Sequence, residues 1–332
     1  MPLVRAVALS IPALLAALAA QAQQAAPGAP DAPTPAALAV GAMQIASDAN
    51  LAVEGVDVSV AAERIVYSYS LRNAGSVDLD LTASVVMPEL AASEDDEETW
   101  TLPADDPANP VALAVTADGA PVATTAAIRA AALGLDRLAE IEAAGLPLIP
   151  FGAAIEKALA GLAPETADRL AALGVVTPRD PAEPDAALRA DWALDVTRSW
   201  RQVLPAGKTT AVGVTFAPIK AEYRLQRGDE KRVADAKDDF CLSAQALAAV
   251  QARLKSGVAL QTTEFEIDLA PPARWLDSPP ATIAVKKPKP DSVVAFCGMD
   301  EKSAGKPAAT GALPDDASET LVNVVVFTPM AK

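Results

Sequence analysis

Hydrophobic and polar residues alternate along the chain between residues 51 and 90. Every second residue is apolar from Ile65 to Leu71 and again from Val77 to Val85. An alternation of period two is typical of β-strands with one buried face and one exposed face. Because turn residues 73–76 separate the two runs, the pattern predicts two antiparallel strands joined by a short turn. Residues 56–60 predict a third strand.

A strand with one apolar face must pack that face on a second layer. The predicted fold class is therefore mainly β (α+β), an antiparallel β-sandwich that is either one large or two small. Further strands are expected at residues 111–116, 120–122, 192–203, 209–216, 260–269, 281–285, 292–297 and 321–327. Asp118-Gly119 predicts a tight hairpin turn, and residues 205–208 a turn from which the next strand returns. The continuous apolar run 321–327 predicts a strand that is buried on both faces.

Helical spacing replaces the alternation between residues 124 and 176, where a three-helix insertion is predicted. The apolar faces are Ile128, Ala131, Leu135, Leu138 and Ala139 for the first helix, Ile155, Leu159 and Leu162 for the second, and Leu170 and Leu173 for the third. Gly145 and Gly174 are expected to end the first and third helices, and Pro164 to begin the third. A further helix is predicted at 243–255, near Cys241, with Ser243 as its N-cap.

The N-terminus has the pattern of a signal peptide, which we expect to span residues 1–22 with cleavage after Ala22. Arg5 precedes an apolar stretch that is too short to span a bilayer as a helix. The chain is then expected to divide into a flexible leader (23–40), N-terminal sandwich strands (41–123), the helical insertion (124–176), a linker (177–190) and a C-terminal β-rich part (191–332). These features predict a periplasmic or secreted protein.

The two cysteines, Cys241 and Cys297, are expected to form a disulfide in an exported protein. The alternatives are two buried thiols or one reactive thiol. The densely charged segment 227–239 is expected to be exposed.

The formal net charge of −16 disfavours nucleic acid and anionic membranes as partners. Residues 94–98 are five consecutive carboxylates, which favour an exposed loop. A calcium site is the alternative, although the spacing lacks the register of a calcium-binding loop. No metal or cofactor is predicted.

The chain contains no histidine, which excludes a Ser-His-Asp or Cys-His nucleophile and the commonest zinc sites. Acid–base catalysis by carboxylates is the kind of enzyme chemistry that these exclusions leave. Glu264, Glu266 and Asp268 share one strand face, as do Asp78 and Asp80, and a glycosidase needs two carboxyl groups facing one cleft. We interpret both sets as solvated outer faces and predict no catalytic residues. The alternative is a carboxylate-based hydrolase acting on cell-envelope polysaccharide.

Large aromatic residues could form a platform for a sugar or a peptide, or fill the core. They are Trp192, Trp200, Trp275, Tyr67 and Tyr69, and in a chain with only 4% aromatic residues we favour the core. The sequence thus predicts a non-enzymatic binding or structural module. Another envelope protein or a glycan is the expected kind of partner.

Several stretches resemble the domain of unknown function 4424 family of bacterial exported proteins. They are residues 51–58, 66–73, 86–88, 118–122, 200–207, 239–241 and 292–297, in the expected order. Residues 271–280 depart from the family's pattern around a tryptophan. The resemblance implies an exported, largely β protein and implies no reaction.

Overall fold

The computed structural model describes residues 34–35, 37–92, 98–177, 187–272, 279, 281–297, 299–303, 308–312 and 320–331. The chain divides into two units, residues 1–32 and 33–332, and all described residues belong to the second. The predicted signal peptide, the leader as far as residue 33, and residues 178–186 of the predicted linker lie outside the described residues.

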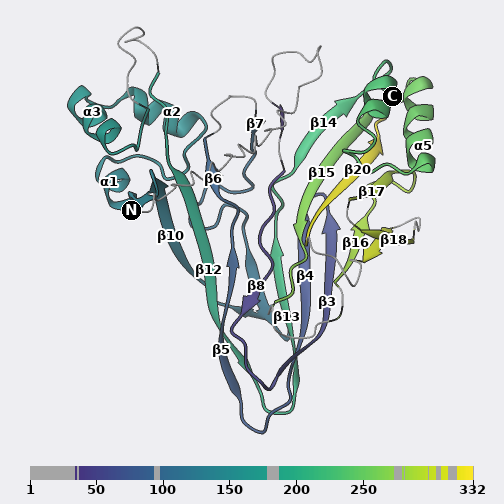
Figure 1. The fold of residues 1–332 in the computed structure, drawn as a ribbon, viewed down its shortest axis with the longest axis horizontal. Helices are drawn as coiled ribbons and strands as arrows, with labels where there is room; N and C mark the ends of the chain where they lie inside the picture. The colour runs from purple at the N-terminus through teal and green to yellow at the C-terminus, as the bar shows by residue number, and fades with distance from the viewer. Residues whose placement is uncertain are drawn as a thin grey trace, which may run out of the picture. The chain divides into compact units, whose positions relative to one another are not determined.

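The largest sheet has eight strands (Figure 1). Its order is β18 (Asp300–Ser303), β19 (Ala308–Ala312), β16 (Thr282–Lys286), β3 (Leu51–Ala61), β4 (Arg64–Asn73), β13 (Thr209–Phe216), β8 (Ala114–Ala117) and β9 (Ala120–Val122). Only the β16–β3 pair within this sheet is parallel. The predicted hairpin turn is confirmed, because Ala117 pairs with Ala120 and both Asp118 and Gly119 have positive φ.

Three smaller sheets complete the β-structure of the described residues. The six-stranded sheet contains β11 (Leu135–Asp136), β10 (Thr125–Ala132), β12 (Ala193–Leu204), β5 (Leu79–Val86) and β2 (Gln44–Ile45), with β6 (Leu90–Ala91) also paired to β12. The four-stranded sheet has the order β14 (Ala221–Leu225), β15 (Leu260–Asp268), β20 (Leu321–Pro329) and β17 (Val293–Phe296). β1 (Thr34–Pro35) pairs in parallel with β7 (Glu98–Thr99).

One hydrophobic core is shared by the three larger sheets. It contains Tyr67 and Tyr69 from β4, Leu194 from β12 and Phe265 from β15, all nearly inaccessible to solvent. β4 and β15 turn alternate residues to this core, as the period-two pattern requires. The predicted mainly β fold class is confirmed, and β20 is buried on both faces at residues 324–327, as predicted.

The predicted hairpins at residues 65–85 and 192–216 are wrong. β4 pairs with β3 and β13, whereas β5 pairs with β12 and β2 in the other sheet. Both connections, from β4 to β5 and from β12 to β13, therefore cross between sheets. Alternation shows that a strand has a buried face, but it does not show which strand is its neighbour.

Five helices occur among the described residues: α1 (Leu138–Ala143), α2 (Ala153–Ala160), α3 (Pro164–Ala172), α4 (Glu230–Asp235) and α5 (Ala244–Lys255). α5 confirms the prediction for residues 243–255, because the Ser243 side chain accepts a hydrogen bond from the amide of Ala246. The first predicted helix is wrong over its first half. Residues 125–132 form β10, which pairs with β12 over seven residues, and only α1 remains helical.

Two segments that were predicted to be flexible or exposed contribute to packing. The end of the predicted leader is ordered against the fold, since Leu38 bridges Ile219 and Val40 is buried. Within the charged segment 227–239, Val233 of α4 is fully buried in a small cluster with α5.

Candidate functional site

A pocket of about 590 Å³ lies between the loop that follows β7 and the loop that leads into α2. Its lining residues are Trp100, Thr101, Leu102, Asp105, Pro107, Pro147, Leu148, Ile149, Phe151, Gly152, Ala153 and Ala154. We call this site the Trp100 pocket. The volume falls in the range of small-molecule and cofactor sites.

The Trp100 pocket lies where two hydrophobic cores meet. Trp100, Leu102 and Phe151 pack against the main core, and Leu148 packs against both this core and the one formed by α1 to α3. The rings of Trp100 and Phe151 are 5.3 Å apart between centroids and tilted relative to each other. The apolar wall is thus continuous with the interior of the protein.

Hydrogen bonds hold both walls of the pocket in place. On one side, the buried Trp192 donates from Nε1 to the carbonyl of Leu148 at 2.9 Å. On the other, the amide of Ala104 donates to the carbonyl of Pro110 at 3.0 Å and the amide of Asn109 donates to the carbonyl of Asp106 at 2.9 Å, which closes the loop that carries Asp105 and Pro107. A site held by such contacts is largely formed before a ligand arrives.

Hydrogen-bond donors without partners occur at and near the Trp100 pocket. The Nε1 atom of Trp100 bonds no group among the described residues, but it is buried and does not face the open space of the pocket. α2 begins at Ala153 after Gly152, which has φ of 86° and no side chain that could cap the helix. The first amides of a helix have no intrahelical acceptor, so the N–H groups of Ala153 and Ala154 remain available.

A second, more polar pocket of about 400 Å³ shares Thr101 and Leu102 with the first. Its ammonium group, Lys220, forms ion pairs with Glu63 at 3.0 Å and Glu222 at 3.3 Å. These charges already neutralise one another in part, so the described lining of this pocket offers a ligand no unpaired cation.

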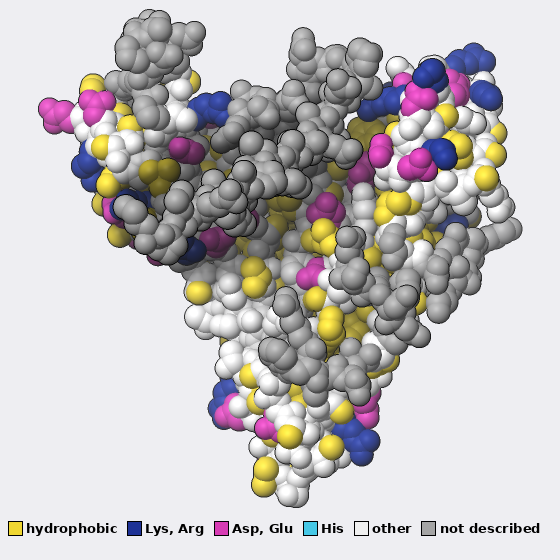
Figure 2. Space-filling model, viewed as in Figure 1, with side chains coloured by type: hydrophobic (Ala, Val, Ile, Leu, Met, Phe, Trp, Pro, Cys, Tyr) yellow, Lys and Arg dark blue, Asp and Glu magenta, His cyan; other side chains and the backbone are white. Residues whose placement is uncertain are grey.

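Charged side chains of both signs are scattered over the protein surface. On the face drawn in Figure 2, small groups of basic side chains lie beside acidic ones at the lower end and at the upper right, and other acidic side chains lie among hydrophobic ones. Together with the net charge of −16, this distribution makes the surroundings unfavourable for anionic ligands.

The predicted carboxylates on β15 are not a solvated outer face, and that interpretation is wrong. Asp268 accepts hydrogen bonds from the amides of Ala42 and Ala270 and from the hydroxyl of Thr320. Glu264 accepts one of 2.5 Å from the hydroxyl of Tyr223, whose pKa is raised by burial and by this carboxylate. The β15 carboxylates therefore hold the N-terminal segment and β14 in place.

The other predicted pair also has structural contacts. Asp78 accepts from the amide of Ala206, and Asp80 forms an ion pair with Arg201. Asp78 and Asp80 are exposed, as the outer-face interpretation predicts, whereas the three β15 carboxylates are only partly accessible. Among these three, Glu266 accepts a hydrogen bond from the amide of Ala39. The geometry gives the hydrolase alternative no support.

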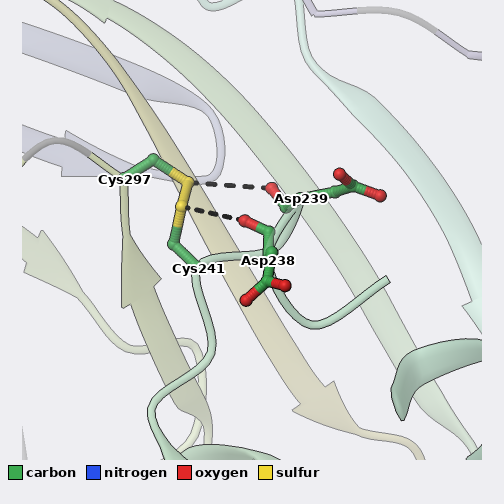
Figure 3. Close-up of a disulfide and its surroundings, with 4 residues drawn as sticks. All are labelled: Asp238, Asp239, Cys241 and Cys297. Carbon is green, nitrogen blue, oxygen red and sulfur yellow. Dashed lines mark hydrogen bonds between the residues drawn. A yellow bond between two sulfur atoms is a disulfide. The ribbon is translucent and has the colours of Figure 1, made fainter. Parts of the chain in front are cut away.

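Cys241 and Cys297 form a disulfide, with their Cα atoms 5.2 Å apart (Figure 3). It joins the segment after α4 to the end of β17. The sulfur atoms lie 3.4 and 3.7 Å from the backbone oxygens of Asp238 and Asp239, respectively. The bond closes one side of the small core formed by α4, α5 and the four-stranded sheet.

The aromatic residues singled out in the sequence lie mostly in the core. Tyr67, Tyr69, Trp192 and Trp200 are all at most 4% exposed, and burial raises the pKa of both tyrosines. Trp275 lies outside the described residues. The sequence analysis missed the two aromatic residues of the pocket, Trp100 and Phe151. Trp100 lies outside any alternating run, two positions after the acidic segment 94–98.

The acidic run 94–98 also lies outside the described residues, except for the backbone of Glu98 in β7. Elsewhere in the described part of the chain, no group of three or more acidic or cysteine side chains could hold a metal ion. None of the described helices has the length and apolar character needed to cross a bilayer.

Comparison with solved structures gives only distant similarities. A candidate nutrient-binding protein from Legionella pneumophila is 8% identical with a TM-score of 0.38, over 86% of this chain and 70% of that one. Yeast LTA4 hydrolase is 10% identical with a TM-score of 0.26, over 84% of this chain and 29% of that one. An M1 zinc metallopeptidase from Deinococcus radiodurans is 10% identical with a TM-score of 0.25, over 83% of this chain and 42% of that one. At these scores, the similarities carry no argument about function.

No curated protein matches the sequence. A family does match, over residues 33–310, which is most of the chain and includes the Trp100 pocket and both cysteines. The chain therefore belongs to the family described as Domain of unknown function (DUF4424).

Proposed function

We propose that this chain is an exported, non-enzymatic binding protein that holds its ligand in the Trp100 pocket. The observation that carries the proposal is that this pocket is apolar, has an aromatic pair and has both walls tied by hydrogen bonds. Such a site gains affinity because little conformational entropy is lost when the ligand binds.

The lining residues support binding rather than catalysis. Asp105 is the single ionisable side chain among them, and it is exposed. The hydroxyl of Thr101 would need a general base within hydrogen-bond reach to act as a nucleophile, and among the described residues no hydrogen bond joins it to Asp105. The pocket offers apolar surface and the first amides of α2 instead.

Export is supported by the leader pattern of residues 1–22 and by the pairing of the two cysteines. Mass spectrometry of the native protein is expected to give a mature chain that begins at Gln23. A retained Met1 would contradict export through a cleaved leader.

Binding can be tested with a neutral, apolar dye such as N-phenyl-1-naphthylamine, whose fluorescence rises in an apolar site. Ala154→Phe should fill the pocket and abolish the fluorescence rise, because Ala154 lines the pocket at the start of α2. Ala160→Phe, an exposed position at the other end of the same helix, should leave dye binding unchanged. Equal dye binding by both variants and the unmodified protein would contradict the proposal.

A further inference from the structure

The polar pocket beside the Trp100 pocket extends the binding site proposed above, on which this inference rests. We call it the Lys220 pocket, after the ammonium group that Glu63 and Glu222 flank. The two pockets, of about 400 and 590 Å³, adjoin along Thr101 and Leu102, which line both. A polar space and an apolar space thus share one stretch of chain. A ligand that fills both must have a polar part and an apolar part.

Carboxylates outnumber cationic groups in the lining of the two pockets. Glu63 and Glu222 line the Lys220 pocket, and Asp105 lines the Trp100 pocket. Lys220 is the single cationic side chain among the described lining residues of both. The surplus charge is negative, and the net charge of the whole chain, −16, has the same sign. An anionic group on the ligand is therefore disfavoured, and a cationic group is favoured.

The two glutamates retain acceptor oxygens for a cationic head. Lys220 Nζ lies 3.0 Å from Oε1 of Glu63 and 3.3 Å from Oε1 of Glu222. In the described part of the chain, no hydrogen bond reaches the second oxygen, Oε2, of either glutamate. Both side chains are open to solvent, with 86% of Glu63 and 44% of Glu222 exposed. An ammonium group that enters this pocket therefore has carboxylate oxygens to bond.

We propose that the two pockets together bind an amphipathic organic cation, a molecule with an ammonium head on an apolar chain or ring. The head lies at Glu63 and Glu222, and the apolar part packs on the ring pair of Trp100 and Phe151. Removal of the apolar part from water supplies binding free energy. The first N–H groups of α2 would favour an anion instead, so an anionic competitor belongs in the test.

The test is displacement of N-phenyl-1-naphthylamine from the full mature chain by competitors that share one linear octyl chain. Octylamine is a cation, octanol is neutral and octanoate is an anion. Octylamine should displace the dye at a concentration about fivefold lower than octanol, as expected for two partly exposed ion pairs. Octanoate should be the weakest competitor. Sodium chloride should weaken displacement by octylamine and leave that by octanol unchanged, because salt screens only the charged interaction.

The double variant Glu63→Gln, Glu222→Gln removes both carboxylates and keeps the size of both side chains. Octylamine should then lose its advantage over octanol, while the dye and octanol should bind as they do to the unmodified protein. Glu54→Gln is the matched control, because Glu54 is a partly exposed glutamate that pairs with Arg72 and lines neither pocket. This variant should bind octylamine as the unmodified protein does.

Lys220→Met tests the same charges in the opposite direction. Without the ammonium group, Glu63 and Glu222 lose the cation with which the ligand head competes. Octylamine should therefore bind more tightly to this variant than to the unmodified protein, as measured by isothermal titration calorimetry. Weaker binding of octylamine to a variant that still binds the dye would overturn the inference.

The outcomes separate this inference from the proposed function. Failure of the dye to bind the unmodified protein would overturn both. If the dye binds but octylamine is no better a competitor than octanol or octanoate, the inference is wrong and the binding function stands. Binding of octylamine that the double glutamate variant leaves unchanged would place the cation elsewhere and overturn the inference as well.

Discussion

The side-chain amide of Asn73 donates a hydrogen bond of 2.9 Å to the carbonyl oxygen of Leu204, 131 residues further along the chain. Asn73 ends β4 and Leu204 ends β12, so the bond joins the two points at which the chain leaves one sheet for the other. The same side chain donates to the carbonyl of Val77 and accepts from the amide of Gly75. One buried residue thus organises both crossings.

Asn73→Ala is expected to lower the free energy of unfolding by about 2–4 kcal/mol, because three hydrogen bonds are lost and buried groups remain unpaired. Urea denaturation measures the change. Asn50→Ala is the matched control: Asn50 lies in an adjacent turn, is exposed and bonds only Asp48 with its side chain, so its loss should cost less than about 0.5 kcal/mol. Equal effects would show that the Asn73 contacts contribute little.

Asp268 is expected to be a second point on which the fold depends. Asp268→Ala removes the acceptors of Ala42 and Ala270 amides and of the Thr320 hydroxyl. We expect a loss of about 2–4 kcal/mol in the free energy of unfolding, together with faster hydrogen exchange of residues 40–45. Asp57→Ala, on the exposed face of β3, should not change exchange in that segment. Unchanged exchange in Asp268→Ala would contradict the assigned role.

The alternation of residues 51–90 could predict strands, because a strand packed on one face requires an apolar residue at every second position. It could not predict their neighbours. A strand has the same pattern whether the next strand in the chain pairs with it or crosses to the facing sheet. In the sequence, nothing distinguishes the buried Asn73 from an ordinary turn residue. Sheet assignment depends on contacts as distant as Asn73 with Leu204.

β10 shows why composition limits such predictions. Its sequence from Thr125 to Ala132 contains mostly alanine. Because alanine is only weakly hydrophobic, such a sequence shows neither the period of a strand nor that of a helix clearly. Ile128 and Leu135 then favoured a helix, whereas pairing with β12 over seven residues decides the strand. Tertiary pairing outweighs a weak local preference.

The Trp100 pocket could not be predicted, since its two walls come from loops near residues 100–107 and 147–154. Loops carry no periodic signal that shows which of them meet. A tryptophan in a polar, aperiodic segment is the one sign that the sequence holds of this site.

The disulfide is expected to stabilise the small core around α5. Cys241 and Cys297 are 56 residues apart, and the chain-entropy model gives about 4 kcal/mol for closing a loop of that length. The double variant Cys241→Ala, Cys297→Ala should therefore unfold at a lower urea concentration. Reductant should lower the midpoint of the unmodified protein and leave that of the double variant unchanged. A reductant-insensitive midpoint in both proteins would contradict a stabilising disulfide.

Glu266 is expected to destabilise the fold at neutral pH. Burial raises the pKa of this half-buried carboxyl above its ordinary value of 4.5, and the nearby Glu264 adds to the effect, while a hydrogen bond from the Ala39 amide offsets part of it. A raised folded-state pKa means that the folded protein binds the proton more tightly than the unfolded chain does. The stability that the protonated carboxyl contributes is therefore lost as pH rises through the range in which glutamate ionises.

Glu266→Gln keeps an acceptor for Ala39 and removes the charge. The difference in free energy of unfolding between this variant and the unmodified protein should be small below pH 4.5, grow in favour of the variant as pH rises, and then level off. Urea denaturation across this range measures the difference, and a difference that does not change with pH would show that the carboxyl is not destabilised by burial.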